Sequence, residues 1–218
     1  MKYKCLVFDH DDTTVNSTAT IHHPAFVRFL EEYFPGRTCS LEDYFLKNFE
    51  PGFIRMCVED YGMDAHDLEV ETQFWLDYVK DHIPSAFPGI AGLMHRHKAE
   101  GGMICVISHS MKQNILRDYE ANSLPEPDLV FGWEQPPEHR KPSVWPLKAI
   151  AEELHLERKD LLMIDDLKPG YDMAKNAGVD FAAAGWANDI AKIEAFMRSN
   201  CRYYFKTVAE LDSFLKEA

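Results

Sequence analysis

Basic residues are too few in this sequence to favour a polyanionic partner. Its 23 lysines and arginines stand against 36 aspartates and glutamates, which gives a formal net charge of −13 over 218 residues. A surface of that sign repels nucleic acids and anionic membranes, so we expect neither as a partner. Long apolar runs are also lacking, and the opening MKYKCLVF reaches Asp9 before it could form a signal peptide. These absences favour a protein of the cytoplasm.

Cysteines are few and scattered. They lie at positions 5, 39, 57, 105 and 201, without a CxxC pair or the His and Cys spacing of a zinc site. An odd, dispersed set of this kind indicates reduced thiols rather than a disulfide framework. The sequence has no internal repeat or low-complexity segment, and nothing in it indicates an oligomeric state. With 46% hydrophobic residues, the chain can form one packed core that carries a sizeable insertion.

Short apolar runs alternate with helical spacing over most of the chain. Unbroken apolar runs are typical of parallel strands buried on both faces, and they lie at residues 3–8, 103–107, 129–131, 161–164 and 179–184, with a weaker one at 202–205. Helical spacing long enough to cross from one strand to the next lies at residues 111–120, 144–154, 169–176, 189–199 and 208–216. The alternation predicts an α/β fold with a Rossmann-like, three-layer core around a parallel sheet.

Residues 17–84 interrupt this alternation after the first predicted strand. They have helical spacing throughout, as in HHPAFVRFLEEYF and DLEVETQFWLDYVKDHI, and no convincing strand. We therefore expect a small all-helical domain at residues 17–84, inserted into a core formed by residues 1–16 and 85–218. The segment FPGI resumes the core, and Pro88 suits the first turn of a helix there.

Acidic side chains follow two of the predicted strands where they end. Asp9 and Asp11 come directly after the first strand, within VFDHDDTT, and Asp165 and Asp166 follow LLMI. The carboxyl ends of parallel strands meet at one edge of a sheet, where ligands bind. Along an extended chain Asp9 and Asp11 face the same way, while His10 turns aside. Carboxylates that converge in this way suit Mg²⁺, a hard cation that prefers oxygen ligands.

Each of these polar residues also has an ordinary explanation. A single aspartate after a strand commonly caps the next turn or helix, although two clusters at corresponding strand ends favour a shared cation. Ser108, with the amides of His109 and Ser110, precedes a predicted helix and is either an anion site or a plain N-cap. Lys141, in HRKPSVWPL, is by itself well explained as a solvated lysine.

Four segments together resemble the motifs of the haloacid dehalogenase superfamily. VFDHDDTTV resembles the first motif, DxDxT, and VISHS resembles the second, a strand that ends in Ser or Thr. RKPSVWPL is similar to the segment of the third-motif lysine, and IDDLKPGYDMAKNAGV to the acidic fourth motif. The four occur in the family's order. The helical insertion also resembles the C1-type cap of phosphoglycolate phosphatase and β-phosphoglucomutase relatives, which implies a lid over the site.

The resemblance implies a role for each matching residue. Asp9 would be the nucleophile that forms an aspartyl-phosphate, and Asp11 the general acid and then the base. Mg²⁺ would be held by Asp9, the backbone carbonyl of Asp11, Asp165 and Asp166. The transferring phosphoryl group would be bound by Ser108, the amide of His109, and Lys141. The sequence departs from the family pattern at three positions: Asp12 and Arg140 replace glycines, and Thr14 replaces an aliphatic residue.

Three residues of the helical insertion are candidates to contact the substrate. His22 and His23 lie near the first linker, where a histidine transfers protons in the mutase relatives, and Arg55 in FIRMCVEDYG could meet a substrate anion. All three can also be ordinary surface residues at or within helices. The aromatic residues around 44–53 and 74–78 fit packing inside the helical domain better than a cofactor site.

Together these features predict a magnesium-dependent phosphatase acting on a small phosphorylated metabolite. One alternative is a phosphomutase of the same fold, which would require a bisphosphate activator. Another is a 2-haloacid dehalogenase, but that reaction needs neither the metal nor Asp11. A third is a relative that binds a phosphorylated ligand without catalysis. The identity of the substrate is not encoded in any short motif, because the cap and its linkers set it by shape.

Overall fold

The computed structural model describes residues 2–217, and this part of the chain divides into two compact units. Asn16–Pro84 forms the helical unit, and the rest of the described chain forms the sheet unit. None of the helices in residues 2–217 is long and apolar enough to cross a membrane.

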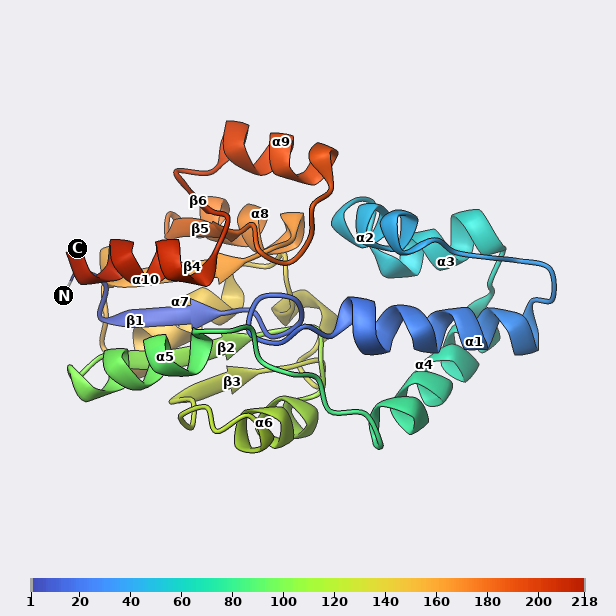
Figure 1. The fold of residues 1–218 in the computed structure, drawn as a ribbon, viewed down its shortest axis with the longest axis horizontal. Coiled ribbons are helices and arrows are strands. Elements are labelled where there is room, and N and C mark those ends of the chain that lie inside the picture. The colour runs from blue at the N-terminus through green and yellow to red at the C-terminus, as the bar shows by residue number, and fades with distance from the viewer. Residues whose placement is uncertain (1, 218) are drawn as a thin grey trace. The chain divides into compact units, whose positions relative to one another are not determined.

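The sheet unit is built on six parallel strands in the order β3-β2-β1-β4-β5-β6 (Figure 1). The strands are β1 (Cys5–Phe8), β2 (Met103–Ile107), β3 (Leu129–Phe131), β4 (Leu161–Asp165), β5 (Asp180–Ala184) and β6 (Tyr203–Phe205). Every residue of β1 is fully buried, as expected for a central strand covered on both faces. The predicted parallel α/β sheet is therefore confirmed: β2 and β3 have the predicted bounds, and each of the other four strands differs by one or two residues at one end.

Strand register brings three strand ends to the same level. Phe8, the last residue of β1, lies opposite Val106 of β2 and Ile164 of β4. The residues that follow β1 and β2 and the end of β4 therefore meet at one edge of the sheet. This edge is where the fold places its site.

Helices cover the sheet and follow its strands in turn. They are α5 (Ile90–Ala99), α6 (Lys112–Ala121), α7 (Trp145–Glu153), α8 (Lys168–Ala177), α9 (Ala191–Asn200) and α10 (Val208–Glu217), with 3₁₀ turns at Pro137–His139 and Arg158–Asp160. The core cluster on one face joins α5, α6 and α10 to every second strand residue, among them Leu6, Ile104 and Leu162. Strand residues of the opposite parity, such as Val7 and Met163, are also fully buried. Both faces are thus covered, which explains why the strands lack polar alternation.

The prediction that Pro88 lies in a first helical turn is wrong. Helix α5 begins at Ile90, and Gly89 precedes it with φ of +94°, a left-handed conformation that favours glycine. The Ile90 N–H donates to the Phe87 carbonyl at 3.1 Å, and the Phe87 N–H donates to the Thr14 carbonyl at 3.1 Å. Phe87 to Gly89 therefore form a turn anchored to the loop after β1, which keeps Pro88 outside the helix.

The helical unit contains a π-helical turn, Thr18–His22, followed by α1 (His23–Tyr33), α2 (Leu41–Phe49), α3 (Phe53–Tyr61) and α4 (Ala65–Val79). Its core is largely aromatic, with Phe26, Phe29 and Tyr44 buried at the centre. Helix α4 begins at a capping box in which Asp64 and Asp67 accept each other's backbone N–H groups. Packing of rings at helical spacing, rather than a cofactor, accounts for these aromatic residues. The all-helical insertion after the first strand is confirmed.

Candidate active site

Three buried carboxylates meet at the edge defined by β1, β2 and β4. Asp9 follows β1, Asp165 ends β4 and Asp166 comes next, and each residue is at most 3% exposed. One oxygen from each carboxylate lies within 4.8 Å of the others. The structure thus brings together acidic residues more than 150 positions apart in the sequence, at the edge where the strand pattern placed them.

Burial makes this carboxylate cluster unstable as a set of bare charges. It raises the pKa of Asp9 well above its usual range, an effect that the positive charge of Lys141 opposes and that Asp165 and Asp11 reinforce. Burial likewise raises the pKa of Asp166, with Asp12 and Asp165 adding to it. Burial thus disfavours the charged form of both carboxylates, a cost that a bound cation would offset.

The donor set fits a divalent cation. Thr13 Oγ1 donates to Asp166 Oδ1 at 3.3 Å, but the buried Asp166 Oδ2 has no hydrogen-bond partner among residues 2–217. A buried carboxylate oxygen without a partner is costly unless something else binds it. Three convergent carboxylates with one open oxygen are ligands of the kind that Mg²⁺ prefers.

Lys141 lies inside this cluster rather than in solvent. Its Nζ is 2.8 Å from Asp9 Oδ1 and 2.8 Å from Asp165 Oδ2, and its side chain is buried. Although burial alone would lower the pKa of Lys141, the charges of Asp165 and Asp9 raise it above the usual value. The structure therefore decides against a solvated lysine at position 141.

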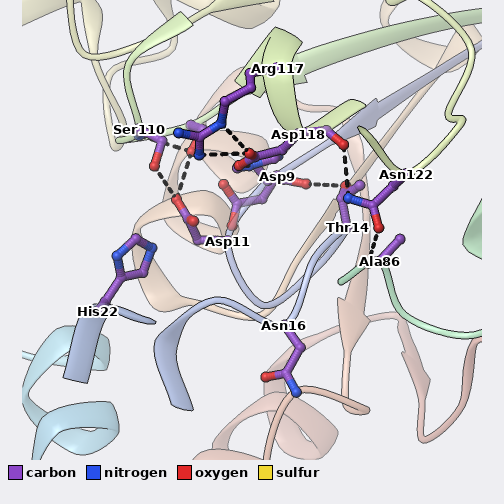
Figure 2. Close-up of polar contacts among 12 residues, drawn as sticks. Asp9, Asp11, Thr14, Asn16, His22, Ala86, Ser110, Arg117, Asp118 and Asn122 are labelled. Carbon is purple, nitrogen blue, oxygen red and sulfur yellow. Dashed lines mark hydrogen bonds and ion pairs between the residues drawn. The ribbon is translucent and has the colours of Figure 1, made fainter. Parts of the chain in front are cut away.

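The carboxylate of Asp11 points toward the loop after β2. Figure 2 shows Asp11 and Ser110 directed at each other, and Asp11 Oδ2 accepts from Ser110 Oγ at 2.6 Å and from Ser108 Oγ at 3.4 Å. Its side chain is not one of the three that converge on the candidate metal position. The hydroxyl of Ser110 was missed by sequence reasoning, which considered only the amide; the second serine of VISHS was the available signal.

Ser108 is not the N-cap of the next helix. Helix α6 begins at Lys112 and its N-cap is Met111, so the plain capping explanation for Ser108 is wrong. Instead, Ser108 Oγ accepts the Ser110 N–H at 3.1 Å, which folds this loop tightly. The ring of His109 lies with Nε2 3.2 Å from the Lys141 carbonyl, so the loop after β2 also contacts the segment that carries Lys141.

The loop after β1 is held by contacts of its own. Thr14 Oγ1 donates to the Asp9 carbonyl at 2.7 Å. Asp12 adopts φ of +61°, the left-handed region that suits the glycine usually found there and that aspartate tolerates better than most residues. Its N–H donates to the Val15 carbonyl at 2.7 Å. Aspartate at position 12 and threonine at position 14 are therefore both accommodated in this loop.

His10 turns away from its two acidic neighbours into the interior. It is 1% exposed, and its Nε2 lies 3.1 Å from Asp118 Oδ2 on α6. Asp118 also accepts from Arg117 Nε at 2.8 Å, as Figure 2 shows. The loop between Asp9 and Asp11 is thereby tied to α6. Nothing in the sequence pointed to this pairing, because its members are 108 residues apart.

The three candidate residues of the helical unit have partners inside that unit. His22 Nδ1 accepts from Trp75 Nε1 at 2.9 Å, and the His23 ring lies with Nε2 2.9 Å from the Cys39 carbonyl. Arg55 is exposed and pairs with Glu59 at 2.7 Å, one helical turn away on α3. Their contribution to a substrate site stays a prediction.

A comparison with protein families identifies the class. Residues 6–184 match the model of the haloacid dehalogenase-like hydrolases. The chain therefore belongs to this hydrolase family, and the resemblance carried by the four motifs is confirmed. A search among curated proteins finds no match.

Solved structures share the fold over nearly the whole chain. A protein from Bacteroides fragilis described as a haloacid dehalogenase-like hydrolase has a TM-score of 0.79 and 22% identity, covering 96% of this chain and 100% of its own. A predicted phosphoglycolate phosphatase from Haemophilus somnus has a TM-score of 0.78 and 16% identity, covering 99% of each chain. CbbY from Rhodobacter sphaeroides, in complex with xylulose-(1,5)bisphosphate, has a TM-score of 0.72 and 18% identity, covering 96% of each chain. At such low identity these likenesses establish a shared fold.

Proposed function

We propose that this hydrolase is a magnesium-dependent phosphatase that cleaves a small phosphorylated metabolite through an aspartyl-phosphate on Asp9. The observation that carries the proposal is the position of Asp9, whose Oδ1 lies 2.8 Å from Lys141 Nζ beside Asp165 and Asp166. A carboxylate can attack a phosphate ester only where positive charge offsets their mutual repulsion. This cluster gathers a lysine and the ligands of a divalent ion at one carboxylate.

In this proposal Mg²⁺ would be held by Asp9, the backbone carbonyl of Asp11, Asp165 and Asp166. When bound, it would supply positive charge that neutralises the carboxylates and the phosphoryl oxygens. The open Asp166 Oδ2 and the raised pKa values of Asp9 and Asp166 support the assignment.

The chain's own residues then divide the chemistry. The carboxylate of Asp9 forms a bond to phosphorus as the bond to the leaving oxygen breaks, and Asp11 donates its proton to that oxygen. Ser108, the amide of His109, and Lys141 bind the other phosphoryl oxygens. Asp11, now a carboxylate, takes a proton from water, whose oxygen attacks phosphorus and releases Asp9. The contact of Asp11 with Ser110 at 2.6 Å supports this role by fixing its orientation.

The helical unit would serve as a cap that sets the substrate, with residues 17–84 as cap and the remainder as catalytic core. His22, His23 and Arg55 are its proposed substrate contacts. The structural relatives include a predicted phosphoglycolate phosphatase and a protein that binds a sugar bisphosphate, which is in keeping with a small phosphate ester. A cytoplasmic location, favoured by the scattered cysteines, completes the proposal.

The test is a hydrolysis screen of phosphorylated metabolites and p-nitrophenyl phosphate, with Mg²⁺ and with chelator, on wild type and Asp9→Asn. We expect phosphate release that requires both Mg²⁺ and Asp9. A sugar bisphosphate added as activator separates a mutase from a phosphatase, and a 2-haloacid tests attack at carbon. Undiminished hydrolysis in chelator, or by Asp9→Asn, would refute the proposal.

A further inference from the structure

The segment after β3 packs closely against the proposed phosphoryl-binding loop. The Trp133 N–H donates to the Ser110 carbonyl at 2.9 Å, and the Lys112 N–H donates to Glu134 Oε1 at 2.7 Å. A Cβ added at Gly132 would lie 2.8 Å from both the Ser110 oxygen and the Lys112 nitrogen, closer than real contacts allow. The two loops therefore form one packed surface, in which Trp133 is fixed at its backbone.

Arg140, one residue before Lys141, contacts this surface through its guanidinium. Its guanidinium is 3.9 Å from the centroid of the Trp133 ring, and its Nε donates to the Gln135 carbonyl at 2.6 Å. The Trp133 ring also meets the ring of His109 edge to face, with centroids 5.8 Å apart. Stacking and one hydrogen bond hold the guanidinium plane in place, so it is pre-organised for a ligand.

The charge of Arg140 is not neutralised by a neighbouring carboxylate. Arg55, Arg117 and Arg198 each form an ion pair, whereas no carboxylate in residues 2–217 forms one with Arg140. Partial burial lowers the pKa of Arg140, and the more distant Glu134 and Glu138 only oppose this effect. Glu134 is itself engaged by the Lys112 N–H.

The charge of Lys141, unlike that of Arg140, is neutralised by neighbouring carboxylates. Lys141 lies between Asp9 and Asp165, so its charge is already shared by two carboxylates. Among residues 2–217 Arg140 makes a hydrogen bond only through Nε, so both Nη atoms of this half-buried guanidinium can bind a planar or tetrahedral oxyanion through two parallel hydrogen bonds. The Trp133 ring under this guanidinium also meets the ring of His109, whose amide is proposed to bind a phosphoryl oxygen, so the subsite would lie beside the phosphoryl site rather than within it.

We propose that Arg140, supported by Trp133, is a subsite for a second oxyanion carried by the leaving group of the substrate. The inference rests on the proposed phosphatase function and narrows it to esters that bear a carboxylate or a further phosphate besides the phosphoryl group that is transferred. It assigns recognition of that second anion to Arg140 of the sheet unit, and the proposed contact of Arg55 is then with another part of the substrate. Arg140 is thus a specificity residue, and its loss would spare esters without a second charge.

The kinetic test compares three substrates in wild type, Arg140→Gln and Arg140→Lys. The substrates are p-nitrophenyl phosphate, which has no second anion, phosphoglycolate, which has a carboxylate, and a sugar bisphosphate. For Arg140→Gln we expect kcat/KM to fall about 10- to 100-fold on whichever anionic ester the wild type prefers, in line with loss of a charged hydrogen bond. Activity on p-nitrophenyl phosphate should change less than about twofold, and Arg140→Lys should be intermediate.

A matched control is Arg198→Gln, because the guanidinium of Arg198 also lies over an aromatic ring, 4.1 Å from the centroid of Tyr204. Tyr204 is in β6, at the opposite end of the strand order from β3. It should leave all three substrates unaffected. Equal losses on all substrates with Arg140→Gln, or no loss on any, would overturn the proposal. So would a selective loss that appears in Arg55→Gln instead.

A binding experiment separates this inference from the proposed function. Calorimetric titration with 3-phosphonopropionate and with methylphosphonate needs no turnover. We expect Arg140→Gln to weaken only the first ligand, about 10- to 100-fold. An inactive wild type would count against the phosphatase alone, whereas equal affinity of wild type and variant for 3-phosphonopropionate would count against Arg140.

Discussion

The two units of this chain bury ionisable groups for different ends. The sheet unit concentrates Asp9, Asp165 and Asp166 around Lys141, and Asp166 Oδ2 has no hydrogen-bond partner within the described part of the chain. The helical unit buries a cluster of aromatic rings and, in α4, the lone carboxylate of Glu71. Packing alone accounts for most of the helical core, but packing gives no reason to gather carboxylates at a strand edge. The burial of several carboxylates together costs stability, and such a cost is expected at functional sites.

The largest effect on activity is expected in the sheet unit, for the variant Asp9→Asn. Turnover should fall by about 10³-fold or more, because an amide is a poor nucleophile toward phosphorus. Stability without Mg²⁺ should hold or rise, since the change removes a buried charge that raises the pKa of its neighbours. Phosphate release and thermal unfolding, measured on the same preparation, test both parts; a marked loss of stability would mean that the carboxylate is mainly structural.

The buried contact between His10 and Asp118 should contribute more to stability than any surface ion pair. Asp118→Ala removes the partner of the buried His10 Nε2 and one partner of Arg117, and leaving such buried polar groups unsatisfied costs about 3 kcal/mol of unfolding free energy. The control is Asp172→Ala, which breaks a partly exposed pair with Lys168 on α8 and should cost about 0.5 kcal/mol. Urea unfolding gives both values, and equal costs would contradict the account of this loop.

Glu71 should make stability depend on pH in the helical unit. Burial raises the pKa of Glu71 to about 7, and nearby His22 acts in the opposite direction. The folded state then binds a proton that the unfolded state releases, so stability is highest below the unfolded pKa and falls as pH rises toward about 7. The unfolding free energy lost over this pH range is at most about 3 kcal/mol.

Two substitutions on α4 test whether Glu71 causes this pH dependence. Glu71→Gln should flatten the fall between pH 5 and 8, measured by urea unfolding, while Glu69→Gln on the exposed side of the same helix should leave it unchanged. If the slope persists in Glu71→Gln, another group is responsible.

The smallest effect is expected at Arg55. Its pairing with Glu59 lies on the surface of α3 and follows helical spacing, so Arg55→Gln should change the unfolding free energy by no more than about 0.5 kcal/mol. Denaturation in low and high salt would check this, because a screened surface pair loses its contribution in salt. A cost of several kcal/mol would show that the helical unit also depends on charge.

Apolar runs made the sheet predictable. A strand buried on both faces must be continuously apolar, so CLVF and MICVI identified β1 and β2 and placed Asp9 and Ser108 at a common edge. The same reasoning brought Asp165 and Asp166 to that edge, because parallel register is fixed by burial.

Side-chain pairing across long separations was not predictable. Neither the partner of His10 nor the engagement of Asp11 by Ser110 follows from any local period, since both depend on which helix packs over the loop. Lys141 was ambiguous for the same reason, until its contacts with Asp9 and Asp165 were known. Pro88 was misplaced because the left-handed turn at Gly89 delays the helix.

The central claim is that carboxylates from two distant parts of the sequence, Asp9 and the pair Asp165 and Asp166, share one divalent ion. Calorimetric titration of metal-free protein with Mg²⁺ tests it directly, with Asp166→Asn as the comparison. We expect one ion per chain in the wild type and an affinity at least about tenfold weaker in the variant. Identical binding by the two proteins, or no binding by the wild type, would contradict it.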